Sequence, residues 1–100
     1  MDKDTEFTDV IFRVDTTKDF KGTVFALFPH DVCTKEGHVT TYQHVGQHSS
    51  ANYPWCIKRS RPATAEELKP LYTELNNLGY LLRIVKKQNY DKYMVSFRKR

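Results

Sequence analysis

The sequence is short of the features that mark several protein classes. No apolar run approaches the roughly 20 residues that a membrane-spanning helix needs. The acidic start of the chain, MDKDTEFTD, has none of the apolar stretch of a secretory signal. Internal repeats and low-complexity segments are also missing. These absences predict a protein without membrane association, and we expect a cytoplasmic location.

Cysteine is scarce, since Cys33 and Cys56 are the two in the chain. In a reducing cytoplasm two free thiols are favoured over a disulfide between them. The sequence has no GxSxG motif and no glycine-rich phosphate loop. A thiol or histidine nucleophile within residues 38–61 would find no acidic residue of that stretch to orient it. We therefore expect a protein that is not an enzyme and that holds no cofactor.

The chain has 100 residues, of which 39% are hydrophobic, and this is enough for one domain. We expect the domain to span residues 8–100, after a disordered stretch at residues 1–7. A domain of this size is marginally stable by itself, which favours further burial in a homo-oligomer.

The net charge of +4 is unevenly distributed, because the first twenty residues are mainly acidic and residues 80–100 are mainly basic. Pairing of oppositely charged antiparallel segments would cancel much of the electric field, and this is the interpretation we favour. A basic face that binds nucleic acid or an acidic partner is the alternative.

Periodicity predicts strands in the first half of the chain. Residues 8–15 alternate between apolar and mixed positions, which is typical of a half-buried strand. Residues 23–28 are almost wholly apolar, as in a central strand, and Pro29 should end it because proline cannot donate to the ladder. Residues 38–48 form a third predicted strand, in which Gly46 indicates a bulge or a close approach of another group.

One helix is predicted over residues 65–78. Thr64 and Glu67 have the spacing of a capping box, and Gly79 suits the left-handed residue that follows a helix. Leucines recur at helical spacing between them and indicate a face that covers the sheet. Pro70 should bend the first turns, because it removes one hydrogen bond.

Further strands are predicted at residues 55–59, as a short edge strand, and at residues 80–86 and 93–98. The order is then β-β-β-(β)-α-β-β. We therefore predict an α+β fold, with a mainly antiparallel sheet of four to six strands and one helix packed on one face.

The stretch from His38 to Cys56 is the strongest candidate for a binding site. It contains three of the four histidines and the single tryptophan. Hydrogen-bonding side chains beside aromatic surface are typical of a small-ligand pocket or of a contact with a host protein. The alternative is a hydrogen-bonded polar core. The predicted ligand-binding residues are Tyr42, Gln43, His44, Gln47, His48, Tyr53 and Trp55.

Two other functions stay open. A mixed metal site can be drawn from Cys33, His38, His44, His48 and Cys56, but no CxxC or HExxH motif accompanies it, so we assign no metal ligand. Aromatic and basic residues also alternate in two segments, as they do in proteins that hold single-stranded nucleic acid. The predicted nucleic-acid contacts are Lys58, Arg59, Arg61 and Arg98.

Several motifs resemble a known group of proteins. The pattern ALFP, YQHVGQH, PATAEEL and LGY, within residues 10–87, is similar to short uncharacterised proteins of gut bacteria and their bacteriophages. The resemblance implies a phage or mobile-element accessory protein in a bacterial host, of the host-takeover or anti-defence type, that acts by binding. It carries over no catalytic residue. Pro70 and the tail after Lys87 depart from the pattern.

Overall fold

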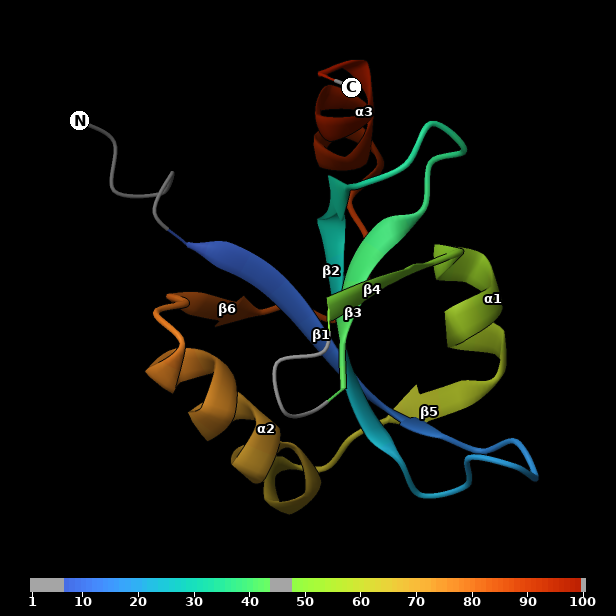
Figure 1. The fold of residues 1–100 in the computed structure, drawn as a ribbon, viewed down its shortest axis with the longest axis vertical. Coiled ribbons are helices and arrows are strands. Elements are labelled where there is room, and N and C mark those ends of the chain that lie inside the picture. The colour runs from blue at the N-terminus through green and yellow to red at the C-terminus, as the bar shows by residue number, and fades with distance from the viewer. Residues whose placement is uncertain (1–6, 44–47, 100) are drawn as a thin grey trace.

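The chain is built around one mixed sheet (Figure 1). The computed structural model describes residues 7–43 and 48–99, and within them the chain forms six strands and three helices. The strands are β1 (Thr8–Asp15), β2 (Val24–Val32), β3 (Val39–Tyr42), β4 (His48–Ala51), β5 (Ser60–Pro62) and β6 (Leu82–Ile84). The helices are α1 (Tyr53–Lys58), α2 (Ala65–Asn77) and α3 (Tyr90–Arg98). The predicted α+β fold with a mainly antiparallel sheet is confirmed.

Strand β1 lies at the centre of the sheet, whose order is β4-β3-β2-β1-β5, with β6 also on β1. The pairs along this path are antiparallel. Strand β6 pairs in parallel with the first residues of β1, and β5 pairs with its last residues. The two short strands therefore share one edge of β1. In the described ranges no helix has the length and apolar character that crossing a membrane requires.

Helices cover both faces of the sheet, and Figure 1 shows α1 and α2 on opposite sides of it. The α2 face contains Val10, Phe12, Ala26, Phe28, Tyr42, Leu71 and Leu75. The opposite face contains Ile11, Phe25, Leu27, Val32, Val39 and Cys56, on which side chains of α1 and α3 pack. Because both faces are covered, seven of the eight residues of β1 are buried, and the half-buried strand predicted there is wrong in this respect.

Two predicted strands are helices. In place of an edge strand at residues 55–59 the chain forms α1, which Asn52 caps by accepting a hydrogen bond from the Trp55 N–H (2.9 Å) and which has Pro54 in its first turn. In place of a strand at residues 93–98 it forms α3, which Asn89 caps in the same way. Short apolar runs fit both the period of a strand and that of a helix, and here packing on the second face of the sheet favours the helix.

The other predictions hold in part. Strand β2 continues through Pro29 to Val32, because the ladder shifts register after Phe28 and a proline is tolerated at such an irregularity. The predicted strand at residues 38–48 is instead two antiparallel strands, β3 and β4. Gly46, with its predicted bulge, lies outside the described residues, as do residues 1–6 of the predicted disordered start.

Helix α2 agrees with its prediction. The Thr64 hydroxyl accepts a hydrogen bond from the Glu67 N–H and the Glu67 carboxylate accepts one from the Thr64 N–H, so the capping box is formed. Gly79 follows the helix with φ of 105°, a conformation that side chains with a Cβ rarely adopt. Pro70 lies inside α2 without ending it. The strand predicted at residues 80–86 is present as the shorter β6.

Candidate ligand-binding site

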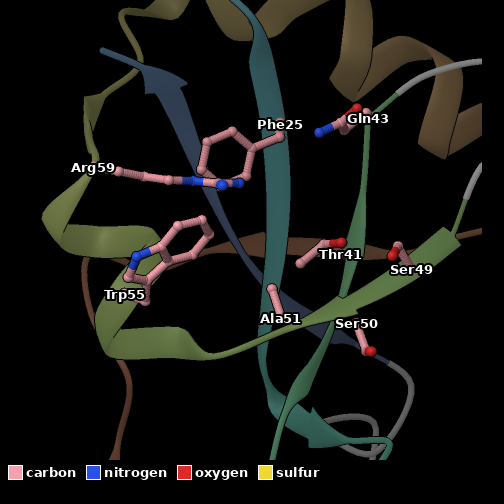
Figure 2. Close-up of a pocket in the computed structure, with 8 residues that line it drawn as sticks. All are labelled: Phe25, Thr41, Gln43, Ser49, Ser50, Ala51, Trp55 and Arg59. Atoms are coloured by element: carbon pink, nitrogen blue, oxygen red, sulfur yellow. The ribbon is translucent and has the colours of Figure 1, made fainter. Parts of the chain in front are cut away.

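A hollow of about 310 Å³ lies between α1 and the outer strands of the sheet (Figure 2). We call it the α1–β4 hollow. It is on the face of the sheet opposite α2, since Phe25, at its back, belongs to that core. Its lining residues are Phe25, Thr41, Gln43, Ser49, Ser50, Ala51, Trp55 and Arg59.

Helix α1 positions the two largest lining residues. The Asn52 cap starts the helix directly after β4, and Arg59 is its C-terminal cap. Trp55 and Arg59 are four residues apart and therefore lie on the same side of the helix. Cys56 faces the core, where it is fully buried, and anchors the helix to the sheet. Trp55 is left 55% exposed above the hollow.

The Arg59 guanidinium is held between two aromatic rings (Figure 2). Its central carbon lies 4.2 Å from the centroid of the Trp55 ring and 5.6 Å from that of Phe25. Its Nε lies 3.3 Å from Oδ2 of the buried Asp15, an ion pair without hydrogen-bond geometry. The main-chain carbonyl of Arg59 accepts hydrogen bonds from the amide and hydroxyl of Thr16. The main chain and the guanidinium of Arg59 are therefore both held by contacts within the protein.

Several polar groups that line the hollow have no hydrogen-bond partner in the described part of the chain. Within residues 7–43 and 48–99, the two Nη atoms of Arg59 have no hydrogen-bond partner, and neither do the side chains of Thr41, Gln43 and Ser49. Among the described residues, Nε of Arg59 is a buried side-chain nitrogen without a hydrogen-bond partner, whereas buried polar groups are normally paired. Unused donors around a fixed planar cation are suited to a carboxylate or phosphate oxyanion, with Trp55 as a flat contact surface.

The structure divides the predicted ligand-binding residues between the two faces of the sheet. Gln43 and Trp55 line the α1–β4 hollow. Tyr42 is buried on the α2 face, where its hydroxyl donates a hydrogen bond to Glu74. His48 lies across the hairpin from Tyr42, with ring centroids 4.8 Å apart, and its Nε2 is 2.8 Å from the Tyr80 hydroxyl.

The remaining predicted residues do not join the hollow. The Tyr53 hydroxyl accepts a hydrogen bond from the Gln88 N–H (2.9 Å), and its ring packs in the core beneath α1. His44 and Gln47 lie outside the described residues. Sequence reasoning missed Phe25, Thr41 and Ser49, and it assigned Arg59 to another function. The helical spacing of Trp55 and Arg59 was the available signal, and it was hidden because residues 55–59 were predicted as a strand.

Of the predicted nucleic-acid contacts, Lys58, Arg59 and Arg61 lie between the end of α1 and β5, and Arg98 lies apart from them. Arg61 binds Glu67 with two hydrogen bonds of 2.8 and 2.7 Å, and this pairing neutralises its charge. The bonds from Arg61, helped by the Thr64 N–H, lower the pKa of Glu67 to about 2. Arg98 is on α3, which lies at the top of Figure 1, whereas β5, which carries Arg61, lies in the lower half.

Of the residues drawn together for a metal site, Cys33 and His38 are neighbours in the structure, and His44 lies outside the described residues. Among the described residues no three histidine, cysteine or acidic side chains form a group that could hold an ion. Cys33 and Cys56 are both free thiols. Cys33 donates to the His38 carbonyl. Burial raises the pKa of the Cys56 thiol, so that it stays protonated in the core.

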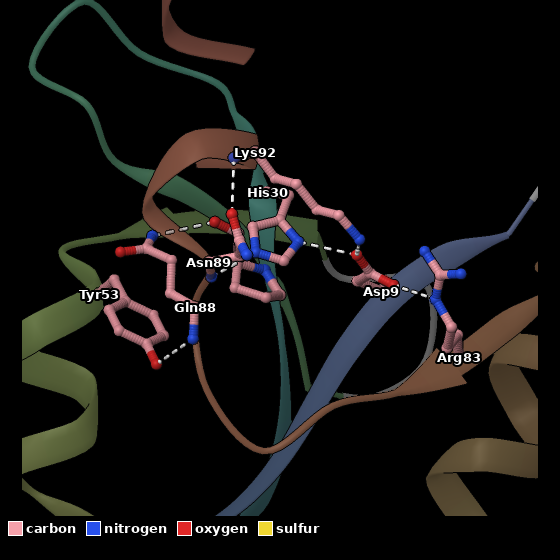
Figure 3. Close-up of polar contacts among 8 residues, drawn as sticks. Asp9, His30, Tyr53, Arg83, Gln88, Asn89 and Lys92 are labelled. Carbon is pink, nitrogen blue, oxygen red and sulfur yellow. Dashed lines mark hydrogen bonds and ion pairs between the residues drawn. The ribbon is translucent and has the colours of Figure 1, made fainter. Parts of the chain in front are cut away.

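A second cluster of polar residues joins β1, β2 and the start of α3 (Figure 3). The His30 Nδ1 lies 2.8 Å from Asp9 Oδ2, and its Nε2 accepts a hydrogen bond from the Asn89 N–H (2.7 Å). Asp9 also accepts a hydrogen bond from Arg83 Nε (2.6 Å) and lies 3.4 Å from Lys92 Nζ. We call this the Asp9–His30 cluster. Both ring nitrogens of His30 are engaged, so this pair offers no free base.

The charges of this cluster are set by burial and by pairing. Burial lowers the pKa of His30 although Asp9 opposes the shift, and His30 is therefore neutral at pH 7. Burial raises the pKa of Asp9, but hydrogen bonds from Arg83 and His30 outweigh it, and the pKa lies below its usual value.

Comparisons of the chain with protein-family models, with curated proteins and with solved structures find no match.

Proposed function

We propose that this protein works by binding and not by turnover, as a phage- or mobile-element-type accessory protein of the host-takeover or anti-defence kind. Its ligand, whether a host protein or a small molecule, presents an oxyanion to the α1–β4 hollow. The observation that supports this is the Arg59 guanidinium, fixed between Trp55 and Phe25 and unpaired at both Nη atoms within the described residues.

Arginine is suited to this role because its planar group presents two parallel donors to a carboxylate or phosphate. An arginine side chain normally loses rotamer freedom when it binds a ligand. Here the two rings and Asp15 hold it in advance, which lowers the entropic cost of binding. Thr41 and Ser49 add hydroxyl donors, and Trp55 adds apolar surface for a flat group next to the anion.

The test is an NMR titration of ¹⁵N-labelled protein with sodium benzoate at constant ionic strength. Benzoate combines a flat ring with a carboxylate, and benzamide is its neutral counterpart. We expect benzoate to shift the Trp55 indole signal and the Thr41 and Ser49 amides. Benzamide should bind about tenfold more weakly, because charge-assisted hydrogen bonds are the stronger ones.

Matched variants locate the effect. Arg59→Gln should abolish the benzoate shifts, whereas Arg98→Gln, the same charge change on α3, should leave them unchanged. Equal affinity for benzoate and benzamide would contradict the proposal, as would shifts that avoid the hollow. Binding of a random oligonucleotide that weakens steeply with salt and is lost in Arg98→Gln would instead favour the nucleic-acid function.

A further inference from the structure

The outer edge of β4 is open for pairing. Within the described residues β4 pairs with β3 alone, so its other edge presents main-chain N–H and C=O groups. Edge strands in natural proteins are commonly protected by lysine, by proline or by a bulge. Strand β4 has the sequence HSSA, with three exposed residues and without lysine, proline or a bulge, so its shortness is the protection that it has. Such an edge is a template for an added strand.

The same strand forms one wall of the α1–β4 hollow. Ser49 pairs with Thr41 and Ala51 with Val39, so these four residues share the face on which the hollow lies. Alternate side chains of a strand point to the same face. An extended chain laid along β4 would therefore direct every second side chain over the hollow, toward Trp55 and Arg59 (Figure 2).

The charges near β4 indicate which kind of peptide would bind along it. Residues 38–61 contain no aspartate or glutamate, while Lys58, Arg59 and Arg61 follow β4 closely. Arg61 is paired with Glu67, and Arg59 is paired with Asp15 through its Nε, so the two Nη atoms of Arg59 are the cationic donors that face the hollow. A carboxylate of the partner would make charge-assisted hydrogen bonds to such a group, which are roughly twice as strong as neutral ones.

We propose that β4 accepts an extended acidic peptide segment as an added strand, with one of its carboxylates bound by Arg59 in the α1–β4 hollow. This inference rests on the proposed function of that hollow and names the class of partner. Main-chain hydrogen bonds to β4 supply affinity, and the carboxylate with its neighbouring side chain at Trp55 supplies specificity.

The test uses the peptide acetyl-Thr-Val-Thr-Glu-Thr-Val-Thr-amide and three relatives. One replaces the glutamate by glutamine, and the other two carry N-methyl groups on one or the other alternate set of amides. Only one set of amides faces the neighbour in an added strand. We expect one methylated peptide to bind about tenfold more weakly and the other to bind normally, because each main-chain hydrogen bond lost weakens binding severalfold. The glutamine peptide should also bind about tenfold more weakly.

Binding is measured by NMR titration of the full chain, with the Arg59→Gln and Arg98→Gln variants as the matched pair. Shifts of the Ser49, Ser50 and Ala51 amides support strand addition. Equal binding of the two methylated peptides would overturn the inference, and so would equal binding of the glutamate and glutamine peptides. If benzoate binds but the peptide does not, the peptide inference fails and the anion site stands. Protection of the β4 amides that grows with protein concentration in the absence of peptide would assign this edge to a second copy of the chain.

Discussion

The α1–β4 hollow and the Asp9–His30 cluster each have an arginine paired with a buried aspartate, and they differ in how the surrounding polar groups are paired. In the cluster, Asp9 binds groups from three other segments, among them Arg83 from β6, and both nitrogens of His30 have partners. In the hollow, the Nη atoms of Arg59 and the Thr41 hydroxyl have no partner among the described residues. The cluster therefore has the pairing of a structural network, whereas the unpaired groups of the hollow are what the proposed anion site requires.

The comparison shows that a histidine beside a carboxylate is weak support for a functional site. His30 and Asp9 have the geometry of a catalytic pair, yet the Asn89 N–H occupies the nitrogen that would act as base. What separates the two regions is hydrogen-bonding capacity that the protein leaves unused.

Replacement of Asp9 by alanine should cause the largest loss of stability. Its side chain is 7% exposed, and the change removes the common partner of Arg83, His30 and Lys92. We expect the free energy of unfolding to fall by about 3 kcal/mol, the cost of breaking a buried charge pair. Urea denaturation measures this. Asp19→Ala, in the exposed turn after β1, is the control and should change stability by less than about 0.5 kcal/mol.

Acidification should destabilise the protein through His30. The folded-state pKa of His30 lies below its usual value of 6.5, so the unfolded chain binds the proton first as pH falls. Stability should therefore be fully present above about pH 6.5 and decline below it, until His30 is protonated in the folded state as well. Asp9, whose folded pKa is below 3.8, stays ionised over this range and loses its contribution only at lower pH.

Urea titrations of the native chain and of His30→Gln between pH 7.5 and 5 provide the measurement. Glutamine offers an amide in place of the ring and does not titrate. The decline between pH 6.5 and 5 should be smaller in the variant. The same pH profile in both proteins would show that other groups, and not the Asp9–His30 cluster, govern the acid response.

Tyr42→Phe should have an intermediate effect and separates the two faces of the sheet. The Tyr42 hydroxyl is bonded to Glu74 on the α2 face, away from the hollow. Its removal should lower the free energy of unfolding by about 1 kcal/mol. Benzoate affinity, measured by the NMR titration above, should not change. A loss of benzoate binding with unchanged stability would place the ligand on the α2 face.

Thr41→Val should have the smallest effect on stability, because the Thr41 hydroxyl has no partner within the described residues. We expect the free energy of unfolding to change by less than about 0.5 kcal/mol. Benzoate should nevertheless bind severalfold more weakly, since one donor of the hollow is lost. If the unfolding free energy falls by more than about 1 kcal/mol while affinity is kept, this hydroxyl is structural, and the contrast between the two regions fails.

Local patterns were sufficient for part of the fold. The capping box of Thr64 and Glu67, the leucine spacing and Gly79 defined α2 from the sequence, and β1 was predicted with the bounds that the structure has. These features are determined by interactions within a few residues along the chain, such as a cap and its N–H partner. The sequence alone therefore determined the α+β class and the helix that covers one face of the sheet.

Only the tertiary structure determined helices α1 and α3 and the set of residues that line the hollow. Residues 53–58 and 90–98 became helices because a second face of the sheet needed cover, and short apolar runs do not specify their period. Alternation along the strand separates Tyr42 from Gln43, but only the packing of α2 decided that Tyr42 is on the covered α2 face and Gln43 is in the hollow. The Arg59 guanidinium is held between two rings because folding brings Phe25 of β2 beside Trp55 of α1. No local pattern relates residues so distant in sequence.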